Sequence, residues 1–169
     1  MLRRLRAENA TEYIALREEA LVNAPLAFEA SLGEDFASDP AILADHLVGA
    51  PEQAIFGVFE TRLVGVAGIF RSRPRKAAHK AHVWGMYVAN ANRRRGHARA
   101  LLEATIKHAR SLPGVLWLHV SVTSGAPEAR ALYESAGFVE WGAEPEALRH
   151  GGQTATEFYL ALQLERPAA

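Results

Sequence analysis

A basic, glycine-containing run directly before the chain's clearest amphipathic segment has the composition of a phosphate-binding loop. A helix N-terminus presents unpaired backbone N–H groups and the positive end of its dipole. The small residues Gly96 and Ala98 let an anion approach that backbone closely, and a diphosphate would suit the site. The alternative is a solvated basic cap in which Gly96 only permits a turn. The residues of this candidate anion site are Arg93, Arg94, Arg95, Gly96, His97, Ala98 and Arg99.

A second group of residues could exchange protons. Residues 115–122 predict a strand whose even positions are aliphatic, so His119 and Ser121 share its other face. His82 lies on the strand predicted over 81–88, and a histidine has a suitable unperturbed pKa for acid–base work. Tyr133 falls on an apolar helical stripe beside Leu132, and that position alone favours a core role.

Some kinds of chemistry are excluded. The chain has no cysteine, which rules out disulfides, thiolate metal sites and a cysteine nucleophile. His46, His108 and His150 show no metal-ligand spacing, so we predict no metal. Trp84, Trp117 and Trp141 are more typical of a core than of ligand platforms.

The composition indicates a globular protein without a general affinity for polyanions. The 169 residues favour one domain over residues 1–169, and 49% are hydrophobic. Lys plus Arg and Asp plus Glu both number 19, and this zero net charge favours neither nucleic acid nor an anionic membrane as a partner. No stretch approaches transmembrane length, and the N-terminus lacks the apolar run of a signal peptide. We therefore expect a cytoplasmic protein.

The N-terminal half predicts an edge strand, two helices and three strands. The edge strand covers residues 1–6, and a helix follows with Asn9 as its cap. Asp39–Pro40 opens a second helix whose apolar face would comprise Ile42, Leu43 and Leu47. Three β-rich runs follow, at 54–59, 63–70 and 81–88.

The C-terminal half predicts alternating helices and strands. A helical stripe from Ala98 to Ala109 ends at Pro113–Gly114, and the strand 115–122 comes next. A short helix spans about Pro127 to Ala136, and Gly137 stops it. Closing strands are expected at 138–141 and 154–164, while 72–78 and 142–153 read as loops.

This order predicts an α+β domain, an α/β sandwich. About four helices would cover a mixed, mostly antiparallel sheet of about seven strands. Three strands in succession favour antiparallel hairpins. The strand–helix–strand passage from 82 to 122 predicts one parallel, right-handed crossover.

Three features together resemble the GNAT superfamily of acetyl-CoA-dependent N-acetyltransferases. The run Arg93 to Ala98 looks like the family's Arg/Gln-x-x-Gly-x-Gly/Ala signature, and it is preceded by Met86-Tyr87-Val88. The helix that follows contains the family-like run Ala100 to Ala104. The segment Ala129 to Phe138 looks like the family's A-x-x-LY-x-x-x-GF pattern, and the match covers residues 82–138 well.

The resemblance implies a strongly curved sheet splayed between the strands at 81–88 and 115–122. The pantetheine arm of acetyl-CoA would lie in that splay, with its amides pairing with the backbone of Met86 and Val88. A backbone N–H near Met86 or Tyr87 would stabilise the oxyanion. The pyrophosphate would bind the N–H groups of residues 94–99.

The resemblance also implies catalytic roles. Tyr133 would donate a proton to the departing thiolate. Some relatives carry Glu where this chain has Ser121, so the base could instead be His119, His82 or a water relay. His82 is similar to a histidine of the serotonin N-acetyltransferases. One departure is Ala126, where many relatives have an Asn that contacts the cofactor.

The function implied is direct transfer of an acetyl group from acetyl-CoA to a primary amine of a small molecule or a peptide. The alternative is a non-catalytic acyl-CoA-binding or regulatory module. We expect segments 24–38 and 142–153 to form the acceptor site, whose substrate the sequence does not specify. The family makes a homodimer through the late strands plausible.

Overall fold

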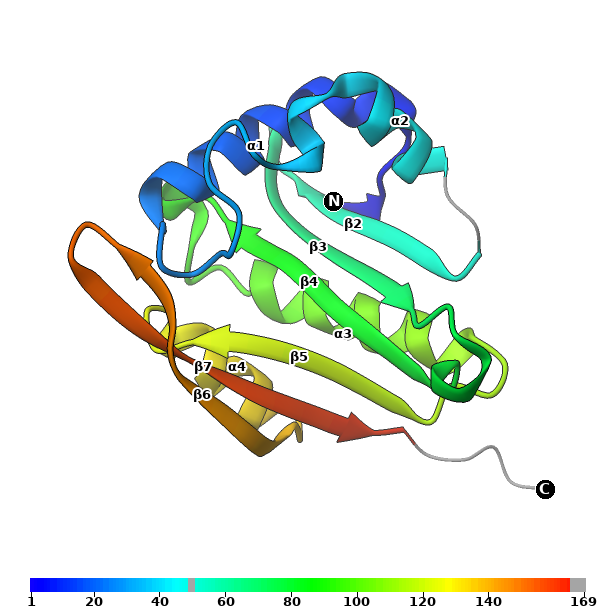
Figure 1. Cartoon of the computed structure of the whole chain (residues 1–169). Coiled ribbons are helices and arrows are strands. Elements are labelled where there is room, and N and C mark those ends of the chain that lie inside the picture. The colour runs from blue at the N-terminus through cyan, green and yellow to red at the C-terminus, as the bar shows by residue number, and fades with distance from the viewer. Residues whose placement is uncertain (49–50, 165–169) are drawn as a thin grey trace.

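The computed structural model describes residues 1–48 and 51–164 and shows one seven-stranded sheet between two layers of helices (Figure 1). The α-helices of the described residues are α1 (Ala10–Asn23), α2 (Pro40–Val48), α3 (His97–Ser111) and α4 (Pro127–Ser135). The strands are β1 (Leu2–Arg4), β2 (Gln53–Phe59), β3 (Leu63–Arg71), β4 (Lys80–Val88), β5 (Trp117–Thr123), β6 (Val139–His150) and β7 (Gln153–Gln163). Their order along the chain is the predicted one.

The sheet has the order β1-β2-β3-β4-β5-β7-β6, and its only parallel pair among the described strands is β4 with β5. This pair is short, because only Lys80, Ala81 and His82 have register partners on β5, at Trp117, Leu118 and His119. Beyond His82 the two strands diverge, as Figure 1 shows. The predicted splay is therefore confirmed, and it leaves backbone groups of both strands facing a gap.

A bulge in β4 lies beside this gap. The register between β3 and β4 shifts between Val66 and Gly68, so that Gly68 pairs with Trp84 while Val66 pairs with Tyr87. Gly85 has a φ of +60° at this shift, a left-handed conformation that glycine adopts without a steric penalty. Trp84 and Tyr87 consequently both pack with the α1 and α2 layer, although they are three residues apart.

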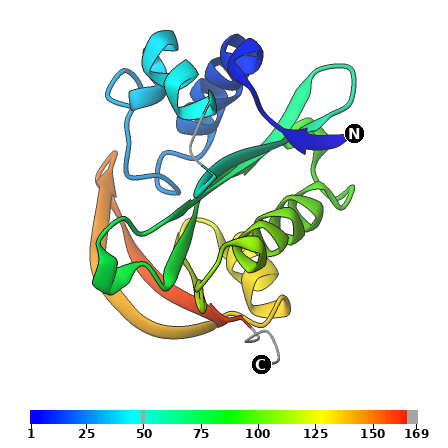
Figure 2. The ribbon, with the colours of Figure 1, turned by 90° about the vertical axis from the view of Figure 1, so that its right-hand side faces the viewer.

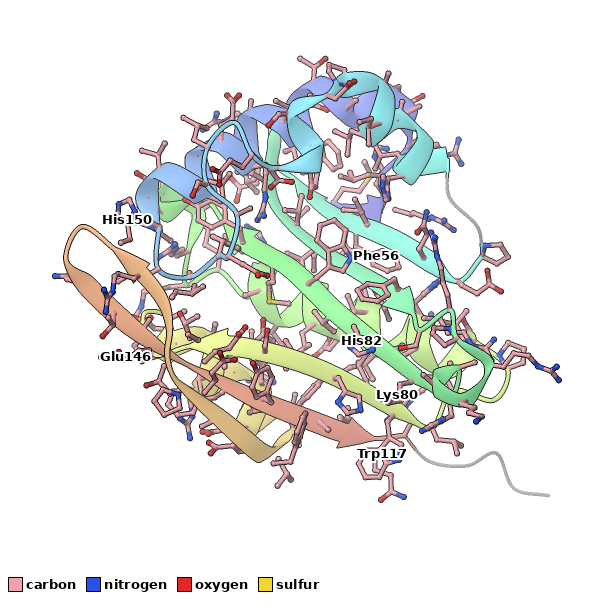
Figure 3. All side chains as sticks on the ribbon, viewed as in Figure 1. Phe56, Lys80, His82, Trp117, Glu146 and His150 are labelled. Atoms are coloured by element: carbon pink, nitrogen blue, oxygen red, sulfur yellow. The ribbon has the colours of Figure 1, made fainter. Side chains whose placement is uncertain are left out.

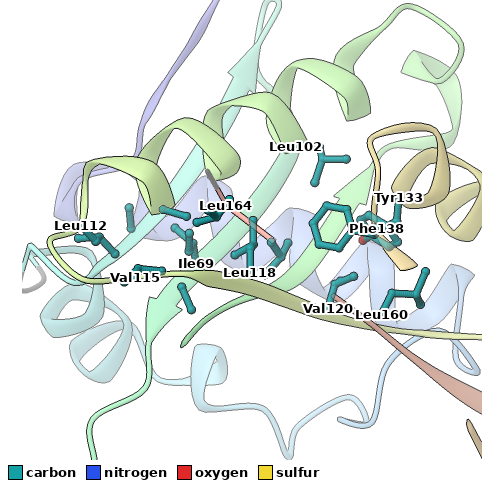
Figure 4. Packing of buried hydrophobic residues seen from close by; sticks show 14 of the residues in the cluster. Ile69, Leu102, Leu112, Val115, Leu118, Val120, Tyr133, Phe138, Leu160 and Leu164 are labelled. Atoms are coloured by element: carbon teal, nitrogen blue, oxygen red, sulfur yellow. The ribbon is translucent and has the colours of Figure 1, made fainter. Parts of the chain in front are cut away.

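Each face of the sheet carries its own core (Figure 2). Helices α1 and α2 cover one face, where Tyr13, Leu16 and Leu43 are buried. Helices α3 and α4 cover the other, where the buried residues include Leu102, Leu118 and Leu160 (Figure 4). The amphipathic stripe predicted for α3 is confirmed, since Leu101, Leu102, Thr105 and Ala109 are all buried.

Three local predictions were wrong, one of which is the core role expected of Trp141, whose surface is 63% exposed on β6. Residues 142–150, predicted as loop, belong to β6, and only Gly151 and Gly152 form the turn to β7. Most residues of β6 are exposed, so no hydrophobic alternation marks the strand, and register shifts interrupt it between Glu140 and Gly142 and between Glu144 and Leu148. Ile42 is 47% exposed instead of joining the apolar face of α2.

The helix starts differ in how they are capped. Asp39 caps α2 as predicted, because its Oδ1 accepts the backbone N–H groups of Ala41 and Ile42 at 2.8 and 3.3 Å. Asn9 occupies the N-cap of α1, but its Oδ1 accepts the N–H of Arg6 at 3.1 Å instead of one from the helix. A turn of 3₁₀ helix at Ala7–Asn9 precedes α1 and redirects that side chain.

Candidate active site

A cavity of about 430 Å³ occupies the place where β4 and β5 diverge. Backbone and side chains of Val83 to Met86 line one wall, and Val120 to Thr123 line the other. The segment between α1 and α2 borders the cavity through residues 27–30, 34 and 35, and α4 borders it through Ala129 and Tyr133. Part of the predicted acceptor segment 24–38 therefore lines the cavity, whereas residues 142–153 are absent from its lining.

Tyr133 is buried in the wall of this cavity, with only 4% of its surface exposed. Its hydroxyl donates to Sδ of Met86 across 3.6 Å, and a thioether is a weak acceptor. Burial raises the pKa of Tyr133 far above its usual value, because the phenolate would be poorly solvated. The phenol therefore keeps its proton at neutral pH and can donate it to an anion that forms nearby.

Ser121 lines the opposite wall, and a carboxylate joins it from β7. Glu157 is the register partner of Thr123, so the antiparallel pairing of β5 with β7 brings it to the same cavity. The hydroxyl of Tyr159 donates to Glu157 Oε2 across 3.4 Å. The sequence analysis missed Glu157. The sequence places this residue on a predicted strand, but only the register of β7 on β5 shows that its carboxylate reaches the cavity.

The two histidines do not line the cavity, but each directly precedes a residue that does, Val83 or Val120. His82 and His119 are register partners at the last paired position of β4 and β5, with ring centroids 5.4 Å apart. His82 lies on the sheet face that Figure 3 shows, and its Nε2 is 2.8 Å from Oγ of Ser72. Desolvation lowers the pKa of both imidazoles, so both are neutral at pH 7 and could accept a proton.

The segment before α3 folds into a concave run of peptide groups. Arg94 has a φ of +61° and Gly96 a φ of +81°, and left-handed residues of this kind turn successive N–H groups toward one point. No atom lies within 4 Å of the position a Cβ would take on Gly96, so the backbone there is open to a ligand. No side chain caps the first turn of α3, because Gly96 is its N-cap. These features fit a diphosphate.

The side chains of this segment contribute less positive charge than the sequence suggests. Arg95 and His97 both bind the carboxylate of Glu60, with Arg95 Nη1 at 3.1 Å and His97 Nε2 at 2.8 Å. The hydrogen bond from His97 and the charge of Arg95 hold the pKa of Glu60 below its usual range. Arg93 donates from Nε to the backbone oxygen of Val88 across 3.1 Å. The candidate anion site therefore consists mainly of peptide groups, because Arg93 and Arg95 are engaged elsewhere.

Met86, Tyr87 and Val88 occupy the bulged end of β4. Met86 lines the cavity, while the Tyr87 ring is buried on the α1 face and the Val88 side chain on the α3 face. Only backbone groups of Tyr87 and Val88 are thus candidates for contact with a cofactor. Ala126, the departure from the family pattern, is the N-cap of α4 and also lines the cavity without offering a polar side chain.

Comparison with known proteins identifies the family of this chain. The sequence model of the Acetyltransferase (GNAT) family matches residues 13–138, so the chain belongs to this family of acetyltransferases. The family uses acetyl-CoA as its cosubstrate. No curated protein matched the sequence.

Solved structures of the same fold include several acetyltransferases. A GNAT-family acetyltransferase from Streptococcus pneumoniae superposes with a TM-score of 0.85 at 15% identity, over 97% of this chain and 99% of that one. A ribosomal-protein-alanine N-acetyltransferase from Brucella melitensis gives 0.82 at 22% identity, over 97% and 99%. A phosphinothricin acetyltransferase from Sinorhizobium meliloti, solved with acetyl-CoA, gives 0.82 at 17% identity, over 97% and 88%.

Two further findings concern the described residues alone. No helix within them is long and apolar enough to cross a membrane. In the same part of the chain, no three His, Asp or Glu side chains gather in a way that could hold a metal ion.

Proposed function

We propose that this protein transfers an acetyl group from acetyl-CoA to a primary amine directly, in a ternary complex. The observation that carries the proposal is the buried hydroxyl of Tyr133, which lies on the wall of the splay cavity and donates to a thioether. A weakly bound, protonated phenol at the point where two strands part is suited to protonating a thiolate.

The cofactor would span two features already described. The peptide groups of residues 94–99 would hold its pyrophosphate, and the unpaired edges of β4 and β5 would hold its pantetheine arm. Acetyl-CoA, when bound, supplies an activated acetyl group on a sulfur leaving group. A peptide N–H at the Gly85–Met86 bulge would donate to the thioester oxygen as negative charge develops on it, and one such donor is worth ~3 kcal/mol.

An amine must lose its proton before or during attack. We propose Glu157 as the acceptor of this proton, because it lines the cavity, whereas His82 and His119 do not. Ser121 faces the same cavity and could position a water between amine and carboxylate. The histidines remain the alternative base through such a water, since their lowered pKa values keep them neutral.

Two of the similar proteins are named for their acceptors, a ribosomal-protein alanine and phosphinothricin. A thiol-release assay with acetyl-CoA and a panel of peptide and small-molecule amines tests the proposal. Amine-dependent release of CoA is expected, and calorimetry should detect acetyl-CoA binding without any amine.

The rival function is a module that binds acyl-CoA without turnover, which Ala126 and Ser121 would suit. Binding of acetyl-CoA with no thiol release across the panel would favour that module. Glu157→Gln separates the candidate bases: it should slow turnover and shift the pH–rate profile. Glu103→Gln, which changes an exposed carboxylate of α3 outside the cavity lining, should do neither.

A further inference from the structure

A larger cavity, of about 730 Å³, lies on the α1/α2 face of the sheet beside the splay cavity. It is bordered by His46 of α2, by β2 and β3, and by the segment that joins β3 to β4. Trp84 lines both cavities, and its indole ring covers Gly68 of β3 so closely that an added Cβ would overlap the ring. The two cavities therefore meet at one aromatic side chain.

The larger cavity is basic. Arg71, Arg73 and Arg75 line it, against a single carboxylate, Glu52. Arg71 is held in place because its Nε donates to the backbone oxygen of Ala78 across 2.6 Å. Within residues 1–48 and 51–164, none of these three arginines forms an ion pair with a carboxylate.

The splay cavity has the opposite charge. Arg17 is its one lysine or arginine, and this guanidinium is already paired with Asp35. The acidic residues that line it are Glu29, Glu34, Asp35 and Glu157. A chain of zero net charge thus presents an acidic and a basic cavity side by side.

This separation of charge has a direct consequence for ligands. Like charges around a concave wall focus the potential and raise the local concentration of oppositely charged groups. An arginine presents a rigid fork of N–H donors that matches a carboxylate or a phosphate. Arg71 is half-buried, while Arg73 and Arg75 are exposed, and all three line the cavity next to the candidate reaction centre.

We propose that the basic cavity, defined by Arg71, Arg73 and Arg75, binds an anionic group of the acceptor, carried at a distance from the amine that enters the splay cavity. The inference rests on the acetyltransferase function proposed above and specifies its substrate class. The acceptor is an amine with a remote carboxylate or phosphate. The ammonium end meets the acidic cavity, the anionic end meets the arginines, and Trp84 lies between them.

Matched acceptor pairs test this assignment and distinguish its two sources of anion. One arm compares peptides with the same neutral N-terminal residue followed either by glutamates or by glutamines. The other compares ω-amino alkyl phosphates with the corresponding amino alcohols over a series of chain lengths. Each acceptor is assayed with the wild type, with Arg73→Ala/Arg75→Ala, and with the control Lys107→Ala/Arg110→Ala, which removes the same charge from exposed positions of α3 on the opposite face.

The anionic member of at least one pair should have the lower KM in the wild type. In Arg73→Ala/Arg75→Ala, the KM of the anionic member should rise about tenfold, while the KM of the neutral member stays within about twofold, so the preference is lost. Added salt should weaken the preference of the wild type as well. The control variant should behave as the wild type. Whichever arm shows the effect identifies the acceptor as an acidic peptide or as a small anionic amine.

Two results would overturn the inference: equal KM values within every pair, or a preference that survives Arg73→Ala/Arg75→Ala. Affinity for the N-acetylated peptides, which cannot react, is measured by calorimetry as a readout that does not need turnover. If no amine releases CoA, the acetyltransferase proposal fails. In that case the basic site stands only if the anionic member of at least one N-acetylated pair, the peptide or the ω-amino alkyl phosphate, still binds more tightly than its neutral partner.

Discussion

Replacing Tyr133 by phenylalanine removes one oxygen atom from a buried side chain and leaves the ring in its packing against Phe138, whose ring centroid is 5.8 Å away. The lost hydrogen bond runs to a thioether across 3.6 Å, so the free energy of unfolding should change by less than ~1 kcal/mol. The catalytic cost should be much larger, since a positioned acid contributes about 10²–10⁴-fold, or ~3–5 kcal/mol of transition-state stabilisation.

The assay is thiol release under saturating and limiting amine, together with calorimetry of acetyl-CoA binding. We expect kcat to fall by about 10²-fold or more while the Kd for acetyl-CoA stays within about twofold, because the hydroxyl acts only when the thiolate forms. Tyr13→Phe is the control, since that phenol belongs to the core beneath α1 and is absent from the cavity lining. It should retain wild-type turnover.

The pH dependence gives a second readout. Because burial raises the pKa of Tyr133, its deprotonation should not lower kcat at any pH below the ordinary tyrosine value of about 10. Turnover of Tyr133→Phe within about twofold of the wild type would refute the assignment of this residue as the acid. An equal loss of acetyl-CoA affinity would show instead that the hydroxyl binds the cofactor.

Three other perturbations have defined outcomes. Gly96→Val forces a β-branched residue to a φ of +81°, which should cost ~1–2 kcal/mol and weaken acetyl-CoA binding in calorimetry. Gly152→Val, with a φ of +78° in the turn between β6 and β7, should cost similar stability but leave that Kd unchanged. Gly68→Ala drives a Cβ into the Trp84 ring, so thermal unfolding should show a loss of ~1–3 kcal/mol; an unchanged Tm would contradict the packing. Burial lowers the pKa of His82 in the folded state, so the fold disfavours its protonated form and stability should decline as pH falls below about 6.5 toward that lowered pKa. His82→Asn should reduce this decline in urea unfolding at pH 5 to 7, and an identical pH dependence in the variant would count against it.

Local patterns sufficed for most elements. Asp39–Pro40 predicted the start of α2, because an acidic cap followed by proline satisfies the first turn without tertiary help. The stripe that includes Leu101, Leu102 and Ala109 predicted α3 and its buried face, since both follow from the helical period. The run before α3 predicted an anion site, and the left-handed residues at Arg94 and Gly96 give this run a concave backbone that would suit one.

The long hairpin of β6 and β7 escaped sequence reasoning, because its strands have little to bury and therefore no alternation to read. The partner of Arg95 also escaped it. Glu60 stands 35 residues earlier, on the turn between β2 and β3, and nothing local connects the two. As a result the three arginines looked like equal contributors to an anion site, and only the structure separates them.

The sequence by itself determined the elements, their order, the family signatures and the residue types available for acid–base work. Tertiary structure alone decided which of those residues meet. Strand register paired Glu157 of β7 with Thr123 of β5, which brought Glu157 to the cavity that Ser121 lines, and it left His82 and His119 outside the lining. The bulge at Gly85 turned Trp84 toward the junction of two oppositely charged cavities. A register and a bulge are set by contacts between distant strands, and a slip of one residue would reverse every side chain on a strand.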